Sequence, residues 1–212
     1  MNTVTEKCKN EVVIRRGATI DDIEGMLRVE KETWSEDQAF TREHFESHLK
    51  VFPEGIFIAE VDGEIAGVGV SELLDYDLAH PIPTWYEVSD EGFIAGTHNP
   101  NGKYLYGVSL SVSPRFSSLK LGSKMLEYCK NSIIQRRLDG FVIGSRVPRF
   151  SKFSTQMTIE QYISAKRGNR KIDPELEFYS QNGFDVIMPL PGYFEDPESL
   201  DYGVLMFWKN PK

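Results

Sequence analysis

The sequence predicts a mixed α/β (α+β) domain, in which helices flank a sheet. Two observations lead to this prediction: runs rich in β-branched and aromatic residues recur along the chain, and segments with helical apolar spacing separate them. Apolar residues make up 40% of the 212 residues, which is enough for one sizeable core. We therefore expect a single domain over residues 12–212, with insertions at about 76–102 and 148–174, after a polar N-terminal segment at 1–11.

The domain is predicted to open with a strand at 12–16. A helix then begins at Thr19 or Asp21, both good capping residues, and ends near Lys31. Helical spacing relates Ile23, Met26, Leu27 and Glu30. A second helix begins at Thr41.

Two histidines of this second helix, His44 and His48, stand four residues apart and therefore share a face. A zinc-protease signature needs Glu directly after the first His, and this chain has Phe45 there. We expect a solvated helix face at this pair and no metal site.

The clearest hairpin joins a strand at 56–61 to a strand at 65–70 through Asp62-Gly63, a strong two-residue turn signal. Segment 76–102 then follows, rich in Pro, Gly and aromatic residues and too long for a plain hairpin loop. It could line a ligand pocket, or it could be an ordered surface cover without a chemical role. Its candidate acids are Glu87, Asp90 and Glu91.

The central feature of the chain is a strand over 104–112 that turns into a long helix, with Pro114 ending the strand. The apolar stripe of the helix comprises Leu121, Met125, Leu126, Cys129 and Ile133. Gly122 falls inside this stripe, where a missing side chain would let the helix lie close on a sheet. Bare N–H groups at such a helix start attract phosphate, and Ser117 and Ser118 could cap it. The alternative is a turn that binds only water.

The remaining strands are predicted at 141–147, 184–188 and 203–208. In the second insertion a capping box starts a helix at Thr158. A basic cluster beyond it comprises Lys166, Arg167, Arg170 and Lys171. A later short helix ends at Gly183, which suits the left-handed position after a helix.

The chain is acidic, with 24 Lys and Arg against 32 Asp and Glu and a net charge of −8. Nucleic-acid binders are usually basic, so we expect no such partner, whereas an acidic field favours cations such as amines. Cys8 and Cys129 indicate no disulfide framework. The polar N-terminus lacks a signal-peptide core and no run reaches the length of a membrane span. These features predict a cytoplasmic protein without a membrane partner.

Val112-Ser113-Pro114, a short turn and the stretch from Gly122 to Leu126 resemble the acetyl-CoA motif of GNAT-type N-acetyltransferases. Two positions depart from it: Ser117 stands where Gln or Arg is usual, and Lys120 stands where the first Gly is usual. Lys120 could place a cation at the pyrophosphate, but its side chain also narrows the approach to the backbone.

Phe178-Tyr179 with Gly183-Phe184 resembles the FYxxxGF element of the same family. The stretches 146–150, 173–184 and 193–208 are similar to the acetyltransferase-like part of bacterial proteins that carry a carbon–nitrogen hydrolase domain behind it. The resemblance covers about residues 12 to 210, and we expect no hydrolase domain in this chain.

The resemblance implies a largely antiparallel sheet of about seven strands, with a V-shaped splay between the fourth and fifth strands. Acetyl-CoA would be the cofactor, with its pantetheine arm in the splay and its pyrophosphate at the helix start. The implied cofactor-binding residues are Leu110, Ser111, Val112, Ser117, Ser118, Leu119, Lys120, Leu121, Gly122 and Ser123. The implied reaction transfers acetyl from acetyl-CoA to a primary amine by direct attack in a ternary complex.

Tyr179 falls on the Tyr that the family uses as an acid toward the departing CoA sulfur; alternatively, it packs at the helix end. An alkyl ammonium with a pKa of about 10.4 must lose a proton before it attacks, so a base should lie near the acceptor. Glu72 and Glu87 are the candidates for this base. The basic cluster could contact the ribose phosphate of CoA or an acidic acceptor, or it could simply be solvated.

A second hypothesis is a catalytically weak acyl-CoA-binding sensor or protein-interaction module that retains the fold, because Ser117 and Lys120 are atypical. For the enzyme, the predicted acceptor is a small-molecule amine or a peptide amine. The sequence does not determine whether the protein forms a homodimer.

Overall fold

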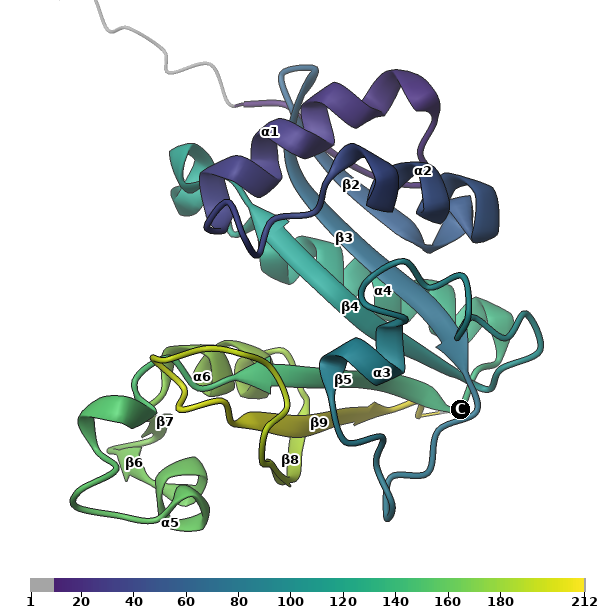
Figure 1. Ribbon diagram of the computed structural model, residues 1–212. Coiled ribbons are helices and arrows are strands. Elements are labelled where there is room, and N and C mark those ends of the chain that lie inside the picture. The colour runs from purple at the N-terminus through teal and green to yellow at the C-terminus, as the bar shows by residue number, and fades with distance from the viewer. Residues whose placement is uncertain (1–9, 212) are drawn as a thin grey trace, which may run out of the picture.

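The computed structural model describes residues 10–211 as one seven-stranded sheet with helices on both faces (Figure 1). In sheet order the strands are β1 (Val12–Arg16), β2 (Ile56–Val61), β3 (Glu64–Leu74), β4 (Tyr104–Val112), β5 (Gly140–Arg146), β9 (Gly203–Lys209) and β8 (Asp185–Leu190). Neighbouring strands are antiparallel except β4 and β5, which run parallel. The predicted mixed, largely antiparallel sheet is thus confirmed.

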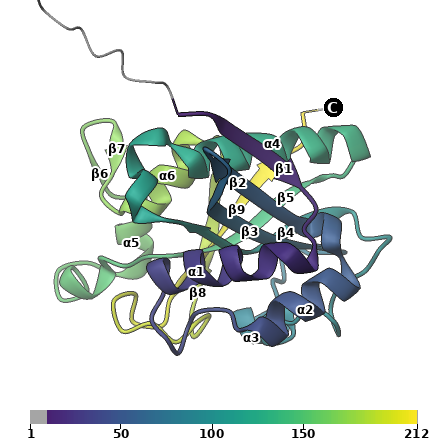
Figure 2. The same ribbon diagram turned by 90° about the horizontal axis from the view of Figure 1, so that it is seen from above.

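The helices fall into two groups on opposite faces of the sheet (Figure 2). One face carries α1 (Ile23–Thr33) and α2 (Arg42–Val51), and the other carries α4 (Leu121–Arg136) and α6 (Pro174–Gln181). The two predicted insertions hold the short helices α3 (Trp85–Ser89) and α5 (Ile159–Ser164), and the second also holds a small hairpin of β6 (Lys166–Arg167) and β7 (Arg170–Lys171). The 3-10 helices are η1 (Ile20–Asp22), η2 (Pro53–Gly55), η3 (Pro114–Leu119) and η4 (Phe150–Lys152).

The parallel pair β4–β5 separates partway along its length. Paired residues run only from Tyr104 opposite Gly140 to Gly107 opposite Ile143, although β4 continues to Val112. Figure 1 shows the two strands diverging beyond this point. The expected V-shaped splay between the fourth and fifth strands is therefore confirmed.

The β2–β3 hairpin turns at Asp62 and Gly63, whose φ angles of 52° and 81° are those of a turn with two left-handed residues. The second strand is longer than predicted, because pairing with β4 continues past an irregularity between Val70 and Ser71 and ends at Leu74. This longer strand brings Glu72 into the middle of the sheet.

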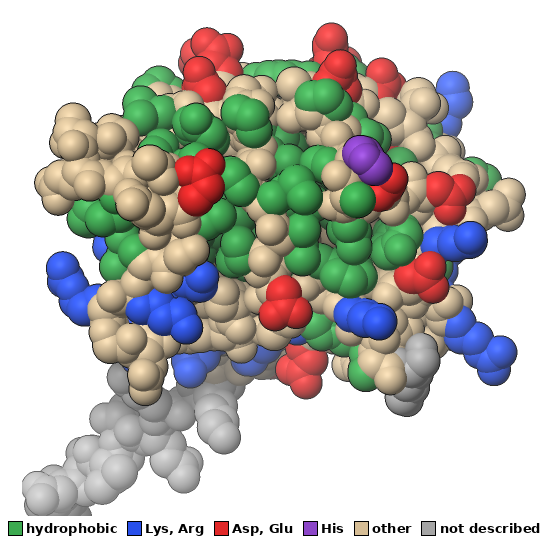
Figure 3. Space-filling model, turned by 90° about the horizontal axis from the view of Figure 1, so that it is seen from below, with side chains coloured by type: hydrophobic (Ala, Val, Ile, Leu, Met, Phe, Trp, Pro, Cys, Tyr) green, Lys and Arg blue, Asp and Glu red, His purple; other side chains and the backbone are tan. Residues whose placement is uncertain are grey.

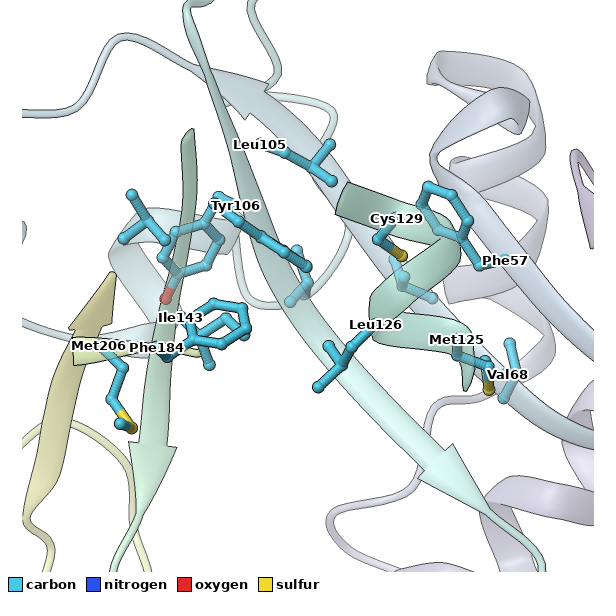
Figure 4. Close-up of a cluster of buried hydrophobic side chains, with 14 of the residues drawn as sticks. Phe57, Val68, Leu105, Tyr106, Met125, Leu126, Cys129, Ile143, Phe184 and Met206 are labelled. Atoms are coloured by element: carbon cyan, nitrogen blue, oxygen red, sulfur yellow. The ribbon is translucent and has the colours of Figure 1, made fainter. Parts of the chain in front are cut away.

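The apolar stripe of α4 packs on the sheet as predicted, with Leu121, Met125, Leu126, Cys129 and Ile133 all buried. The close approach depends on a strand glycine: a Cβ on Gly67 would lie 2.9 Å from the Met125 sulfur. Figure 4 shows Cys129 beside Phe57 and Met125 beside Val68.

The role predicted for Gly122 is different in the structure. A Cβ at this position would first meet the ring of Phe178 in α6, at 3.1 Å, and only then Val112 of the sheet, at 3.9 Å. The glycine in α4 therefore makes room for the neighbouring helix more than for the sheet.

The expectation of a solvated face at His44 and His48 is wrong. His48 is completely buried, and its Nε2 lies 2.6 Å from the carbonyl oxygen of Gly92 in the first insertion. His44 stacks on Phe93 of the same insertion with ring centroids 4.1 Å apart. Both histidines face inward because segment 76–102 folds back over α2, which the spacing of the pair could not reveal.

Figure 3 shows the molecule from below, where apolar side chains gather in a broad central area with acidic and basic side chains nearer its edges. Strands β8 and β9 lie on this side in Figure 1. Within residues 10–211, no helix has the length and apolar character needed to cross a membrane.

Candidate active site

The start of α4 follows the tight helix η3, and Lys120 joins the two in a left-handed conformation, with φ 53° and ψ 39°. The first bond of the α-helical ladder runs from the Lys124 N–H to the Lys120 carbonyl oxygen, at 3.2 Å. The N–H groups of Leu121, Gly122 and Ser123 come before that ladder begins, as at any helix start. A helix N-terminus of this kind favours an anion.

Ser117 and Ser118 do not cap this helix, contrary to the sequence prediction. Both are exposed residues within η3, and the cap position belongs to Lys120, whose side chain makes no capping hydrogen bond. The turn between the strand and the helix takes the form of η3 followed by the left-handed Lys120, so the α-helix begins at Leu121, after both serines.

The open edge of β4 presents backbone groups toward the splay. The N–H of Ser113 donates to the Ala66 carbonyl of β3 at 2.9 Å, so by strand alternation Ser111 also faces β3. Leu110 and Val112 then direct their N–H and C=O groups toward β5, beyond the point where pairing with β5 ends. Of the predicted residues on this strand, these two present backbone groups to the opening, whereas Ser111 contributes its side chain elsewhere.

Two cavities lie against the splay. The first, of about 650 Å³, is bounded by the end of α1, segment 35–40, α3 and segment 193–197. The second, of about 380 Å³, lies between α4, α6, β4 and β5. Five residues line both cavities: Trp34, Val108, Ser109, Gly144 and Arg146. The two cavities therefore adjoin where the sheet opens.

A buried polar chain lies beside this junction. The Trp34 indole N–H donates to the Ser111 hydroxyl at 2.7 Å, and that hydroxyl donates to the Glu30 carboxylate at 2.5 Å. The Phe40 backbone N–H donates to the other carboxylate oxygen at 3.1 Å. Burial raises the pKa of Glu30 and the two hydrogen bonds oppose this rise. Glu30 lines the first cavity, and hydrogen bonds hold both of its carboxylate oxygens.

Arg146 is the cation at the junction. Its guanidinium lies 5.3 Å above the Trp34 ring, and its Nε donates to Asp196 at 2.8 Å. Burial alone would lower the pKa of Arg146, but the bond to Asp196 and nearby acids raise it, so the charge is fixed. Glu175 lines the second cavity, and burial raises the pKa of Glu175 to about 7, opposed by Arg146.

Tyr179 lies on α6 and lines the second cavity. Its ring packs edge-on against Phe178 and Phe184, with centroids 5.1 and 5.6 Å away. Burial, then the charge of Glu175, raises the pKa of Tyr179 well above its ordinary value, so the phenol keeps its proton at neutral pH. The side chain thus packs at the helix end and also lines the cavity, and its role toward the CoA sulfur stays a prediction.

Glu72 and Glu87, the bases considered from the sequence, line neither cavity. Glu72 is fully buried, accepts a hydrogen bond from Thr97 at 2.7 Å, and burial raises its pKa to about 8. Glu87 is exposed and accepts from the Thr84 hydroxyl at the start of α3. The choice of a base from these two stays a prediction.

The first insertion contributes Trp85, Tyr86 and Glu91 to the first cavity, as one of the two sequence interpretations allowed. Asp90 instead accepts a hydrogen bond from the Gly96 N–H within the insertion. The basic cluster of the second insertion lies on the β6–β7 hairpin and lines neither cavity.

Sequence reasoning missed Glu30, Trp34 and Arg146 as site residues. One feature of the sequence could have pointed to Glu30: it lies on the apolar face of its helix, where a buried acid needs a hydrogen-bonding partner. Trp34 and Arg146 gave none, since their contact depends on how α1 and β5 meet across 112 positions of the chain.

A parallel strand pair opens beside a helix start, and a cavity lies on either side of the opening. This is the arrangement that the resemblance noted in the sequence implies for an enzyme that binds acyl-CoA. The chain belongs to the acetyltransferase (GNAT) family, whose family model matches residues 20–145. It is therefore an acyl-CoA-dependent acyltransferase.

Relatives of known sequence support the same family. The chain is 34% identical to the "Uncharacterized N-acetyltransferase YkwB" of Bacillus subtilis (strain 168), over 95% of this chain and 91% of that protein. It is also 34% identical to the "Probable hydrolase YhcX" of the same organism, over 89% of this chain but only 37% of that protein. This chain thus spans little more than a third of YhcX, in agreement with the resemblance to acetyltransferase-like parts of hydrolase-bearing proteins.

Solved structures share the fold. The loading GNATL domain of CurA from Lyngbya majuscula superposes with a TM-score of 0.84 at 24% identity, covering 95% of this chain and 98% of that one. The GphF GNAT-like decarboxylase, solved with isobutyryl-CoA, gives a TM-score of 0.81 at 22% identity, covering 93% of this chain and 99% of that one.

Proposed function

We propose that the protein transfers acetyl from acetyl-CoA to a primary amine by direct attack in a ternary complex. The observation that supports this most is the pair of cavities that adjoin at Trp34, Ser109 and Arg146. With a donor in one cavity and an acceptor in the other, the reacting atoms meet at the splay without a covalent enzyme intermediate.

The residues around the second cavity fit a CoA thioester. Acetyl-CoA supplies an activated acyl group and a thiolate that can leave. Leu110 and Val112 offer backbone groups for the pantetheine arm, as bare strand edges do. The pyrophosphate would lie on the N–H groups from Ser117 to Ser123, with the Lys120 side chain exposed beside them.

We assign proton transfer to Glu30 and hydrogen bonding of the leaving thiolate to Tyr179. Glu30 takes the proton from the acceptor ammonium, because it lines the first cavity and its raised pKa makes it a stronger base than an ordinary carboxylate. Tyr179 hydrogen-bonds the sulfur in the second cavity, since its raised pKa favours donating a hydrogen bond over full proton transfer.

Calorimetry with acetyl-CoA, followed by a thiol-release assay over a panel of primary amines, tests the proposal. We expect acetyl-CoA to bind and free CoA to appear only with a suitable amine. Binding without release across a broad panel would favour the acyl-CoA sensor, and no binding would leave a protein-interaction role.

A second candidate is decarboxylation of a carboxyacyl-CoA, which one fold neighbour suggests through its description as a GNAT-like decarboxylase. The observation in its favour is Arg146, a fixed cation at the junction of the cavities that could hold a carboxylate. Incubation with malonyl-CoA in the absence of amine tests this candidate: appearance of acetyl-CoA and CO₂ would support decarboxylation, and unchanged malonyl-CoA would rule out decarboxylation of this substrate.

A further inference from the structure

The walls of the first cavity are unusually aromatic. Six rings line it: Trp34, Phe40, Trp85, Tyr86, Tyr193 and Phe194. Several of them pack on one another, so the wall is continuous: Phe194 meets Trp85 edge-on at 5.4 Å and stacks with Tyr86 at 5.8 Å. Phe40 stacks with Trp85 at 6.2 Å from the other side. Aromatic rings therefore form much of the wall of the first cavity.

Hydrogen bonds fix the position of the aromatic wall. The Trp85 indole N–H donates to the Val108 carbonyl at 3.0 Å, and its backbone N–H donates to the Tyr193 carbonyl at 2.8 Å. The Tyr193 hydroxyl is hydrogen-bonded to that of Tyr106 inside the core. A ligand would meet preorganised rings, which lowers the entropic cost of binding.

The charge at this cavity is negative. Asp37, Glu91 and Glu195 are exposed carboxylates at its edge, and no ion pair within residues 10–211 involves any of them. The one lining guanidinium, that of Arg146, is already paired with Asp196. A cation entering here gains both from the carboxylates and from the ring faces.

We propose that the acceptor is an amine carried on an aromatic group by a short alkyl linker. The inference rests on the proposed function, since it names the substrate class of the same site. The ring packs against Trp85 and Phe194, the carboxylates at the edge draw in the ammonium, and the amine reaches Glu30 at the splay. A peptide N-terminus fits this wall poorly, because its backbone amides need polar partners that aromatic rings do not supply.

Calorimetry on the CoA-saturated protein tests the class with three matched probes: tryptamine, tryptophol, which lacks the charge, and 2-cyclohexylethylamine, which lacks the π face. We expect tryptamine to bind at least about fivefold more tightly than either of the others. Equal affinity for tryptamine and either probe would overturn the proposal.

Variants locate the binding. Glu91→Gln with Glu195→Gln should weaken tryptamine binding by about tenfold in a salt-dependent manner. Glu127→Gln, which changes an exposed acid of α4 outside both cavities, should leave tryptamine binding unchanged. Phe194→Leu should weaken tryptamine more than 2-cyclohexylethylamine. Equal losses in the Glu127 variant, or none in the others, would refute the site.

Turnover separates this inference from the proposed function. Tryptamine that binds in this cavity without releasing CoA would support the ligand class and refute amine acetylation. CoA release with peptides or butylamine, but none with tryptamine, would support acetylation and refute the aromatic class.

Discussion

Lys120 gives the sharpest test of the CoA loop, because one residue combines a backbone constraint with a charge. Its φ of 53° is a left-handed value that costs a residue with a side chain about 1 to 2 kcal/mol. Glycine avoids that cost but gains about 0.4 to 1 kcal/mol of chain entropy in the unfolded state. Lys120→Gly should therefore raise the free energy of unfolding by about 0.5 to 1 kcal/mol, or roughly 1 to 4 °C in Tm.

Lys120→Ala removes the same charge but keeps the side-chain penalty, so it should leave Tm nearly unchanged. If the ammonium meets the pyrophosphate, both variants should weaken CoA by about two- to fivefold, with the loss shrinking at high salt. Thermal melts and calorimetric titration with CoA measure the two effects separately.

Arg137 provides the matched control, because it is also left-handed, with φ 57°, at the other end of the same helix. The two ends of α4 are about 24 Å apart at ~1.5 Å per residue. Arg137→Gly should stabilise the protein by a similar amount without changing CoA affinity. Equal Tm values for the Gly and Ala variants at position 120 would refute the backbone argument, and unchanged or tighter CoA binding would refute the cation.

Tyr179→Phe should lower turnover by about tenfold or more while CoA affinity stays within about twofold, as measured by thiol release and calorimetry; unchanged turnover would remove Tyr179 from the mechanism. Glu72→Gln should become more stable relative to the natural protein as the pH rises. Burial raises the pKa of Glu72 in the folded protein to about 8, whereas its pKa in the unfolded chain is about 4.5. The natural protein therefore loses stability as the pH rises from about 4.5 to about 8, and the Gln variant does not. Urea midpoints at pH 5 and pH 8 measure this, and a pH-independent difference would contradict it. Gly144→Ala should lower the free energy of unfolding by about 1 to 3 kcal/mol, because the new Cβ would overlap the Tyr193 hydroxyl. Gly69→Ala, with its nearest neighbour 3.5 Å away, is the control in the same melts, and equal losses would show that the overlap is relieved cheaply.

Local patterns predicted most elements of the fold, because their causes lie within a few residues. The strand at 104–112 was predicted with the bounds that β4 has, and the turn at Asp62-Gly63 follows from two residues that accept left-handed angles. The caps predicted at Ser117 and Ser118 were wrong, because a 3-10 turn holds both serines and the α-helix begins only at Leu121.

Short motifs mark two parts of the proposed site, Tyr179 and the loop at 117–123, because each pattern lies within one segment. Tyr179 lines the second cavity, the loop lines neither cavity, and their roles stay predictions. Glu30, Ser111 and Trp34 form their hydrogen-bonded chain across as many as 81 positions, and no local pattern pairs them. The inward turn of His48 likewise depends on an insertion that ends some 50 residues later in the sequence.

The bond from the Trp85 indole to the Val108 carbonyl has a consequence for how such a protein could change its partner. The Val108 carbonyl lies where β4 and β5 stop pairing, and it accepts a hydrogen bond from a side chain of the first insertion instead of from β5. Replacing that insertion would therefore change the wall of the first cavity and leave the second cavity as it is. The Trp85–Val108 bond thus ties the first insertion to a strand residue that lines both cavities.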